Sequence, residues 1–345
     1  MLYVDYFLSY LLTLHRSSNM NTTMLRASVL LLSVMSGLSA MAQTPAWPNK
    51  PVKIINNFPA GGPSDIMARA IAEKLQTNSG QAVVVDNKPG AGGNIGAAEV
   101  AKSAGDGTTI FSGIDTAFTV NPHIFPNIPF KLGSKKGDLK PLVIVSSNGL
   151  LLGTSSAKGI RSMGELIAQG KGGGVNFSSG GAGSPGHLGV ALFSQAGALK
   201  ITHVPYRGNS PAVLAIVSGE VDGGILSVSG MLPHVKSGKI VPVAVTSQQR
   251  SKSLPDVPTV KELGYPELEN EVITVLMVPG DTPETLMTAM KKAVLDVLAQ
   301  PALRERLATL DMVYEGLTDA AATKRLTDLS TRYAKIVKAT HMKVE

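Results

Sequence analysis

The fold is decided by the stretch from Ile54 to Leu75, which reads IINNFPAGGPSDIMARAIAEKL. Its first residues form an apolar run that is typical of a buried strand. Met67, Ile71 and Leu75 then recur at intervals of four, which is the period of a helix that buries one stripe. The stretch therefore predicts a strand, a short loop and a helix.

The loop of this unit consists of Pro59, Ala60, Gly61 and Gly62, and Pro63 suits the first turn of the following helix. The first N–H groups of a helix have no intrahelical acceptor and stand at the positive end of its dipole. Such a position binds small anions, carboxylates included, without a basic side chain. A plain capped turn is the alternative reading of the same composition.

A second glycine-rich loop, SSGGAGSPGH, occupies residues 178–187 between a predicted strand at 174–177 and a predicted helix that runs to residue 196. It repeats the chemistry of the first loop, and we therefore expect a cleft in which each loop holds one carboxylate of a ligand. The candidate ligand contacts on this loop are Ser179, Gly180, Gly181, Ala182, Gly183, Ser184 and His187.

The composition favours a folded protein with room for two domains. The chain has 345 residues, of which 43% are hydrophobic and 17% charged. Its formal charge of +7 favours small anions as ligands, whereas no dense basic patch with aromatic residues points to nucleic acid. The sequence contains no Cys, so its core must hold the fold together without disulfides.

The N-terminal residues predict export. Arg26 precedes an apolar run at 27–38, and Ala40-Met41-Ala42 gives the small-x-small pattern of a signal cleavage site. The run is shorter than the roughly 20 residues that a membrane span needs. We expect cleavage near Ala42, with residues 1–23 explained by an early gene start. An uncleaved anchor is the alternative.

The mature chain alternates strands with helices, which predicts an α/β fold in two lobes. An apolar run at 141–145 is expected to be the first crossing between the lobes, and another at 240–246 the return crossing. The expected division is an N-terminal extension with signal peptide at 1–42, the first lobe at 43–145 and 241–345, and the second lobe at 146–240. Two helices are expected at the C-terminal end.

Several enzyme motifs are incomplete. The stretch from Gly181 to Gly186 fits G-x-G-x-x-G but lacks the acidic residue that would hold a ribose, and only Arg207 keeps an NADP site open. Residues 182–186 resemble a nucleophile elbow without a suitable base. No H-E-x-x-H, C-x-x-C or P-loop pattern is present. An exported NADP-dependent or hydrolytic enzyme is therefore the alternative hypothesis, and no metal or cofactor is expected.

The chain resembles the substrate-binding proteins of tripartite tricarboxylate transporters, the Bug-type periplasmic receptors. The resemblance follows the order of short motifs along nearly the whole mature chain. These are WPNKP (47–51), FPAGGPSD (58–65), GAGGNIG (90–96), AKSAGDG (101–107), NP (121–122), GAGS (181–184) with HL (187–188), PYRG (205–208), GEVD (219–222) and LPDVPT (254–259).

The resemblance implies a type II periplasmic binding fold with the ligand cleft between two lobes joined by two crossing segments. It also implies a monomeric, non-catalytic periplasmic receptor for a di- or tricarboxylate, an acidic amino acid or an aromatic acid. Its implied partners are the membrane components of a tripartite transporter, and a membrane sensor is the alternative recipient.

The resemblance adds candidate specificity residues beyond the two loops. Ser112, Asp115 and Thr116 lie where the family varies its ligand contacts. An acid at Asp115 would favour a ligand with a positive group, such as an amino acid. Asp222 is expected either to fix loop geometry or to recognise an amino group.

Overall fold

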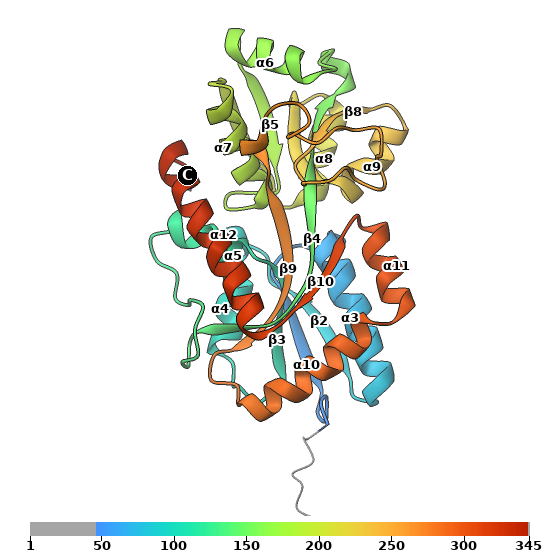
Figure 1. Cartoon of the computed structure of the whole chain (residues 1–345), viewed down its shortest axis with the longest axis vertical. Coiled ribbons are helices and arrows are strands. Elements are labelled where there is room, and N and C mark those ends of the chain that lie inside the picture. The colour runs from blue at the N-terminus through green and yellow to red at the C-terminus, as the bar shows by residue number, and fades with distance from the viewer. Residues whose placement is uncertain (1–45, 344–345) are drawn as a thin grey trace, which may run out of the picture. The chain divides into compact units, whose positions relative to one another are not determined.

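The computed structural model describes residues 46–343 (Figure 1). The expected signal peptide and its cleavage near Ala42 lie outside these residues. The strands are β1 (Val52–Asn56), β2 (Val83–Asn87), β3 (Thr109–Ile114), β4 (Leu139–Ser155), β5 (Val175–Ser179), β6 (Ile201–Pro205), β7 (Gly223–Ser227), β8 (Ile240–Val245), β9 (Glu271–Pro279) and β10 (Val313–Leu317).

Helices precede or follow most of these strands. They are α3 (Pro63–Ser79), α4 (Asn94–Lys102), α5 (Thr116–Thr119), α6 (Met163–Gly172), α7 (Pro185–Ala196), α8 (Asn209–Ser218), α9 (Val228–Lys236), α10 (Glu284–Leu298), α11 (Pro301–Thr309) and α12 (Asp319–Thr340). Short 3₁₀ turns occupy Ala91–Gly93, Asn121–His123, Ser156–Lys158 and Pro266–Leu268. No helix in the described residues is both long and apolar enough to cross a bilayer.

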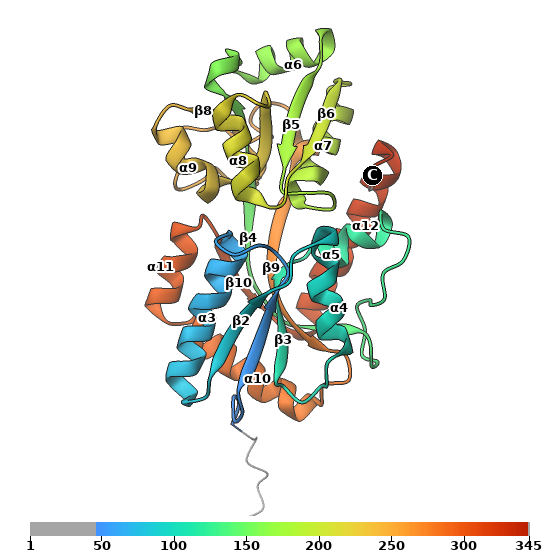
Figure 2. The ribbon, with the colours of Figure 1, turned by 180° about the vertical axis from the view of Figure 1, so that it is seen from behind.

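The opening strand, loop and helix form as the sequence predicts. β1 pairs in parallel with β2 on one side and β3 on the other, and all its residues except Lys53 are buried. Ile54 belongs to the same buried cluster as Met67 of α3, whereas Ile55 belongs to the cluster of Ala97 in α4. Viewed from behind, α3 and α4 flank these strands (Figure 2). α3 begins at Pro63.

The strand β4 continues from one half of the sheet into the other. Residues 141–145, which the sequence suggests as a crossing segment, belong to this one strand of 17 residues. β4 pairs with β9 as far as Gly149, opposite Glu271, and pairs with β7 from Leu150 onward, opposite Ser227. β4 and β9 run side by side along the long axis (Figure 1).

The segment expected as the return crossing is instead a strand at the second half of the sheet. Residues 240–245 form β8, which pairs with β4 between Leu151 and Ser155. The chain returns through β9, which lies between β4 and β3 and pairs with both. An apolar run of six residues fits an internal strand as well as a crossing, so its hydrophobicity alone does not separate the two.

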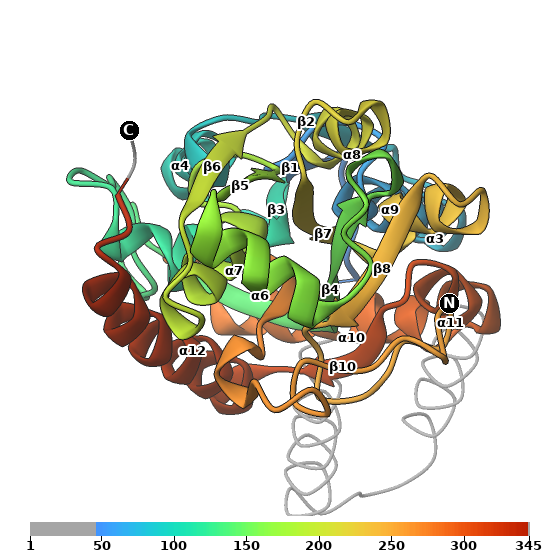
Figure 3. The ribbon, with the colours of Figure 1, turned by 90° about the horizontal axis from the view of Figure 1, so that it is seen from above.

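The C-terminal region contains more elements than the two helices expected. α10 and α11 are separate helices, and β10 adds an antiparallel strand beside β4. Pro301 begins α11, as suits a residue without an N–H. α12 then runs along the outside of the molecule and contacts α5, α7 and β4 (Figure 3).

Candidate ligand-binding site

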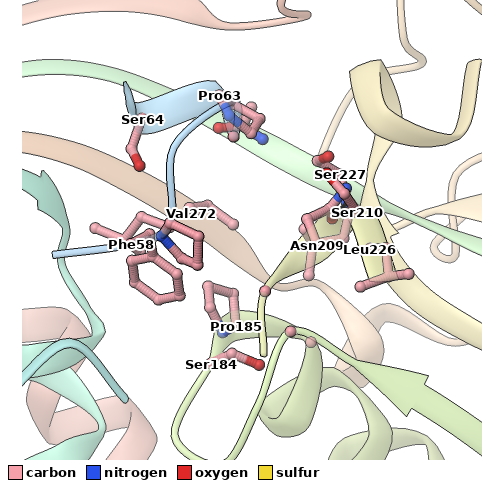
Figure 4. A pocket seen from close by; sticks show the side chains of 18 of the residues that line it. Phe58, Pro63, Ser64, Ser184, Pro185, Asn209, Ser210, Leu226, Ser227 and Val272 are labelled. Atoms are coloured by element: carbon pink, nitrogen blue, oxygen red, sulfur yellow. Dashed lines mark hydrogen bonds between the residues drawn. The ribbon is translucent and has the colours of Figure 1, made fainter. Parts of the chain in front are cut away.

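A cavity of about 160 Å³ lies where the two halves of the sheet meet (Figure 4). One water needs about 10–15 Å³ of such space, so the cavity suits a small organic molecule. Its walls are Phe58, Pro59, Ala60, Gly62, Pro63, Ser64, Ile114, Asn148, Leu150, Gly180, Ser184, Pro185, Gly186, Arg207, Gly208, Asn209, Ser210, Pro211, Ile225, Leu226, Ser227, Val272, Thr274 and Met312.

The first wall is the N-terminal end of α3. Within the described residues the N–H groups of Ala60, Gly62 and Ser64 have no protein acceptor, and all three residues line the cavity. The N–H of Gly61 instead donates to the Asp65 carboxylate at 2.9 Å, and Gly61 does not line the cavity. The free N–H groups and the helix dipole make this wall favourable for an anion.

The second wall is the N-terminal end of α7. The Ser184 hydroxyl caps this helix by accepting a hydrogen bond from the His187 N–H. Gly180 and Gly186 line the cavity, and in the described part of the chain their N–H groups have no protein acceptor. This wall is therefore a second helix terminus with free N–H groups at the cavity, an arrangement that favours an anion.

A third helix terminus, which the sequence analysis missed, completes the walls. Gly208 precedes α8, and Gly208, Asn209, Ser210 and Pro211 all line the cavity. Gly208 adopts a φ of 112°, a conformation that favours glycine. In all three loops a glycine is followed within three residues by a proline at the start of the helix, and this is the signal that would have revealed the third terminus.

The floor of the cavity is the sheet itself. Ile114 of β3 lies opposite Thr274 of β9, and Val272 of β9 lies opposite Asn148 of β4. These four residues and Leu150 line the cavity from strands that connect its two sides. The floor is mostly apolar, so it suits the carbon chain of a ligand whose charged ends meet the helix termini.

The charge of the lining favours an anion. Arg207 is the one ionisable side chain among the lining residues, and it is exposed. No acidic side chain stands among them. An anion in this cavity would therefore meet three positive helix ends and one cation without facing a carboxylate.

Asp115 does not line this cavity and is fully buried. Its Oδ1 accepts a hydrogen bond from the Ile273 N–H at 2.9 Å, and its Oδ2 accepts one from the Thr119 hydroxyl at 2.8 Å. Burial raises the pKa of Asp115 to about 6, although both hydrogen bonds oppose the rise. The structure therefore gives Asp115 a role between α5 and β9 instead of the expected contact with a cationic ligand group.

Other residues predicted for the site also lie outside the cavity lining. Ser112 and Thr116 are buried without lining either cavity. Asp222 accepts a hydrogen bond from the Asn176 N–H at 2.8 Å and lies 3.7 Å from the Lys158 ammonium. Of its two suggested roles, this geometry matches the positioning of the backbone.

His187 lies behind the second loop. Its ring stacks on that of His203 with centroids 4.0 Å apart, and its Nδ1 accepts a hydrogen bond from the Gly183 N–H. His203 also lies 2.6 Å from the Ser179 hydroxyl. Burial lowers the pKa of His187 to about 3 and that of His203 to about 4, so both rings are neutral near pH 7. The pair supports the loop from outside the cavity.

A second cavity of about 590 Å³ adjoins the first and shares Phe58, Pro59, Gly180, Arg207 and Gly208 with it. Gly181 and Ala182 of the second loop line this outer cavity, as do Gly90, Ala91, Gly92 and Gly93. Of the sequence-predicted residues, the inner cavity thus contains Pro59, Ala60, Gly62, Gly180 and Ser184. The described residues contain no group of three or more potential metal ligands.

The sequence and the fold both have known relatives. Residues 67–342 match the family described as the tripartite tricarboxylate transporter family receptor, TctC. BugT of Bordetella pertussis is 34% identical over 334 residues, which cover 94% of this chain and 100% of BugT.

Two solved structures are similar to this chain both in fold and in sequence. Rpa4515 of R. palustris with adipate has a TM-score of 0.78 and 27% identity, covering 86% of this chain and 99% of that one. MatC (Rpa3494) from Rhodopseudomonas palustris with bound malate has a TM-score of 0.75 and 25% identity, covering 84% of this chain and 100% of that one. The fold is thus the two-lobed one of periplasmic binding proteins, and the chain belongs to the tripartite tricarboxylate transporter receptor family of periplasmic solute-binding proteins.

Proposed function

We propose that this protein captures a small carboxylated metabolite in the inner cavity and delivers it to the membrane components of a tripartite transporter. The observation that carries the proposal is the convergence of the N-terminal ends of α3, α7 and α8 on one cavity. Each helix terminus contributes about 0.3–1 kcal/mol toward holding an anion, and up to about 2 kcal/mol when partly buried. Three such ends together favour an anionic ligand, and a carboxylate is an anion that fits a cavity of this size.

The relatives support a ligand with carboxylates at both ends. Adipate and malate, the ligands of Rpa4515 and MatC, are both dicarboxylates. In this chain the ends of α3 and α7 belong to opposite sides of the cavity, so each would hold one carboxylate. Tricarboxylates, acidic amino acids and aromatic acids are the further members of the proposed ligand class.

The protein acts as a receptor without catalysis in this proposal. Ser179 and His203 form a Ser–His pair at 2.6 Å, and neither residue lines the inner or the outer cavity. Ser184 lines the inner cavity, but its hydroxyl caps α7. We further propose export to the periplasm with removal of residues 1–42, and action as a monomer.

The pairing of β4 supports a proposed division into lobes. The partner strand changes between Gly149 and Leu150, and β9 provides the second connection. We place one lobe at residues 46–149 and 271–343 and the other at 150–270. Clefts at such a junction are common ligand sites.

Calorimetry on the purified protein tests the proposal with a panel of dicarboxylates, tricarboxylates, acidic amino acids and aromatic acids. We expect saturable binding of at least one acid with one site per chain, and no change of that acid in the NMR spectrum after prolonged incubation. Conversion of the acid into a product would refute the receptor function, and a panel without any binding acid would refute the ligand class.

A further inference from the structure

Among the neutral polar side chains that line the inner cavity, three are buried and carry an oxygen without a protein hydrogen-bond partner in the described residues. We call them the polar trio: Ser64, Asn148 and Thr274. Their exposed fractions are 2%, 9% and 1%. They come from α3, β4 and β9, three elements far apart in the sequence. Within the described residues the hydroxyls of Ser64 and Thr274 have no protein hydrogen-bond partner. Figure 4 shows the Ser64 hydroxyl turned toward the space beside Val272.

Asn148 has a defined amide orientation. Its Nδ2 donates to the Gly149 carbonyl at 3.0 Å, which requires the nitrogen on that side. Its Oδ1 is buried and has no hydrogen-bond partner in the described chain. An oxygen of this kind accepts hydrogen bonds only, so the missing partner is a donor. Buried acceptors without a partner are rare and call for an explanation.

The register of the sheet brings Asn148 and Thr274 together. Asn148 lies opposite Val272, and Thr274 is two residues further along β9, so the two polar residues are diagonal neighbours on the cavity floor. Diagonal residues on one face of an antiparallel pair lie about 7–8 Å apart, which allows one ligand group to contact both side chains.

We propose that the polar trio selects carboxylates that carry a hydroxyl group on their carbon chain. A hydroxyl donates to the Asn148 Oδ1 and accepts from the Thr274 or Ser64 hydroxyl, so it satisfies both kinds of group at once. An ammonium group donates only, and no acidic side chain lines the cavity to balance its charge. An unsubstituted chain leaves the Asn148 oxygen without a partner. This inference rests on the proposed capture of carboxylates.

Matched acids of equal length test the inference by calorimetry: succinate, malate and aspartate, and then glutarate, 2-hydroxyglutarate and glutamate. We expect at least one enantiomer of the hydroxy acid to bind about tenfold more tightly than the unsubstituted acid, and the amino acid to bind most weakly. In Asn148→Leu the ratio of the affinities for the hydroxylated and the unsubstituted acid should fall to less than about threefold, because the oxygen that accepts from the ligand hydroxyl is gone.

Two further variants separate recognition from folding. Thr274→Val should also lower the preference, whereas Thr274→Ser, which keeps a hydroxyl, should retain it. All variants are compared by thermal unfolding, and Thr274→Val carries the test if Asn148→Leu does not fold. Equal binding of hydroxylated and unsubstituted acids, or an undiminished preference in the folded variants, would overturn this inference alone. Failure of every acid to bind would overturn the proposed function as well.

Discussion

The Asp65 carboxylate accepts a hydrogen bond at 2.9 Å from the N–H of Gly61, four residues earlier in the first loop. The same carboxylate accepts one from the Asn87 amide at 2.9 Å and forms an ion pair with Arg69 at 3.0 Å. Asp65 is 2% exposed and does not line the cavity. Its contacts tie the loop to α3 and to the end of β2.

Asp65→Ala is expected to destabilise the protein by about 2–3 kcal/mol, because it leaves the Gly61 N–H and the Asn87 amide without their acceptor. Burial alone would raise the pKa of Asp65, but the hydrogen bonds from Gly61, Arg69 and Asn87 together lower it. The stabilisation is thus present above the ordinary pKa of about 3.9 and is lost as the pH falls through the lower folded value.

Denaturant unfolding between pH 7 and pH 3 measures this contribution of Asp65. The difference in unfolding free energy between wild type and Asp65→Ala should narrow at the acidic end. Asp65→Asn is the matched control, since its Oδ1 can still accept from Gly61 while the charge is gone. A difference that does not change with pH would show that the carboxylate charge is unimportant.

Gly183→Ala should weaken ligand binding at least tenfold. Gly183 has a φ of +75°, and an added Cβ would lie 2.4 Å from the Asn121 Oδ1. Asn121 is held in place because its Nδ2 donates to the Gly92 carbonyl and the Asn94 Oδ1. The substitution would therefore push apart the loops that meet at the cavities.

Gly159→Ala is a matched control for Gly183→Ala. Gly159 has a φ of +74°, and no atom lies within 4 Å of an added Cβ. Both variants should lose about 1–2 kcal/mol of stability from the left-handed backbone. Calorimetry with the best acid of the panel should show unchanged affinity for Gly159→Ala. Equal losses of affinity in both variants would contradict the role of the close approach.

Arg207→Gln should reduce affinity by no more than about fivefold. The side chain is exposed, and exposed ion pairs contribute about 0.2–1 kcal/mol. The helix N-termini, which are backbone groups, should retain most of the binding. Affinity measured at low and high salt tests this, since the variant should show the weaker salt dependence. Complete loss of binding would place the main anion contact on Arg207.

Asp115→Asn should stabilise the protein at pH 8 by an amount on the order of 1–3 kcal/mol. Burial raises the pKa of Asp115 to about 6, so the folded state binds an extra proton between about pH 4 and pH 6. The charged form is therefore penalised above pH 6, and stability falls as the pH rises through this interval. An amide still accepts from the Ile273 N–H and carries no charge.

Melting temperatures of wild type and Asp115→Asn at pH 4, 6 and 8 test whether the stability of the wild type falls as the pH rises. Both variants lack the titrating carboxyl, so each should gain on the wild type as the pH rises. Asp115→Ala should remain less stable than Asp115→Asn at every pH, because it leaves the Ile273 N–H unpaired. A variant with lower stability than the wild type at pH 8 would show that the carboxylate is stabilising in its charged form.

Local units of this fold were predictable, whereas long-range pairing was not. The strand, loop and helix around Gly61 depend on neighbouring residues, and so does the unit around Gly183. The continuity of β4 depends on partners on both edges, and polar residues at 146–148 followed by Gly149 conceal it in the sequence. Hydrophobic periodicity shows which residues of a segment are buried, but it does not show which strands pair with that segment.

The candidate site was predictable to the same degree. The two glycine loops were found because their composition is distinctive, and the third terminus at Gly208 repeats only part of it. Asp115 was expected to face a ligand because it follows β3, but a turn into α5 directs its carboxylate to the Ile273 N–H instead. The floor residues Asn148 and Thr274 carry no motif, since only strand register brings them together.

The shared strand β4 determines how this protein can be recombined with its relatives. β4 continues through the junction, whereas β9 begins at Glu271, so a graft of residues 150–270 cuts one strand, β4, at the point where its partner changes. In a chimera with joints after Gly149 and after Asn270, the β4–β9 pairing comes from one protein and the β4–β7 pairing from the other. A joint in the polar segment at 131–140 would instead pair β4 of one protein with β9 of the other. Chimeras with new ligand preferences are therefore best made by exchanging the whole segment between these two joints.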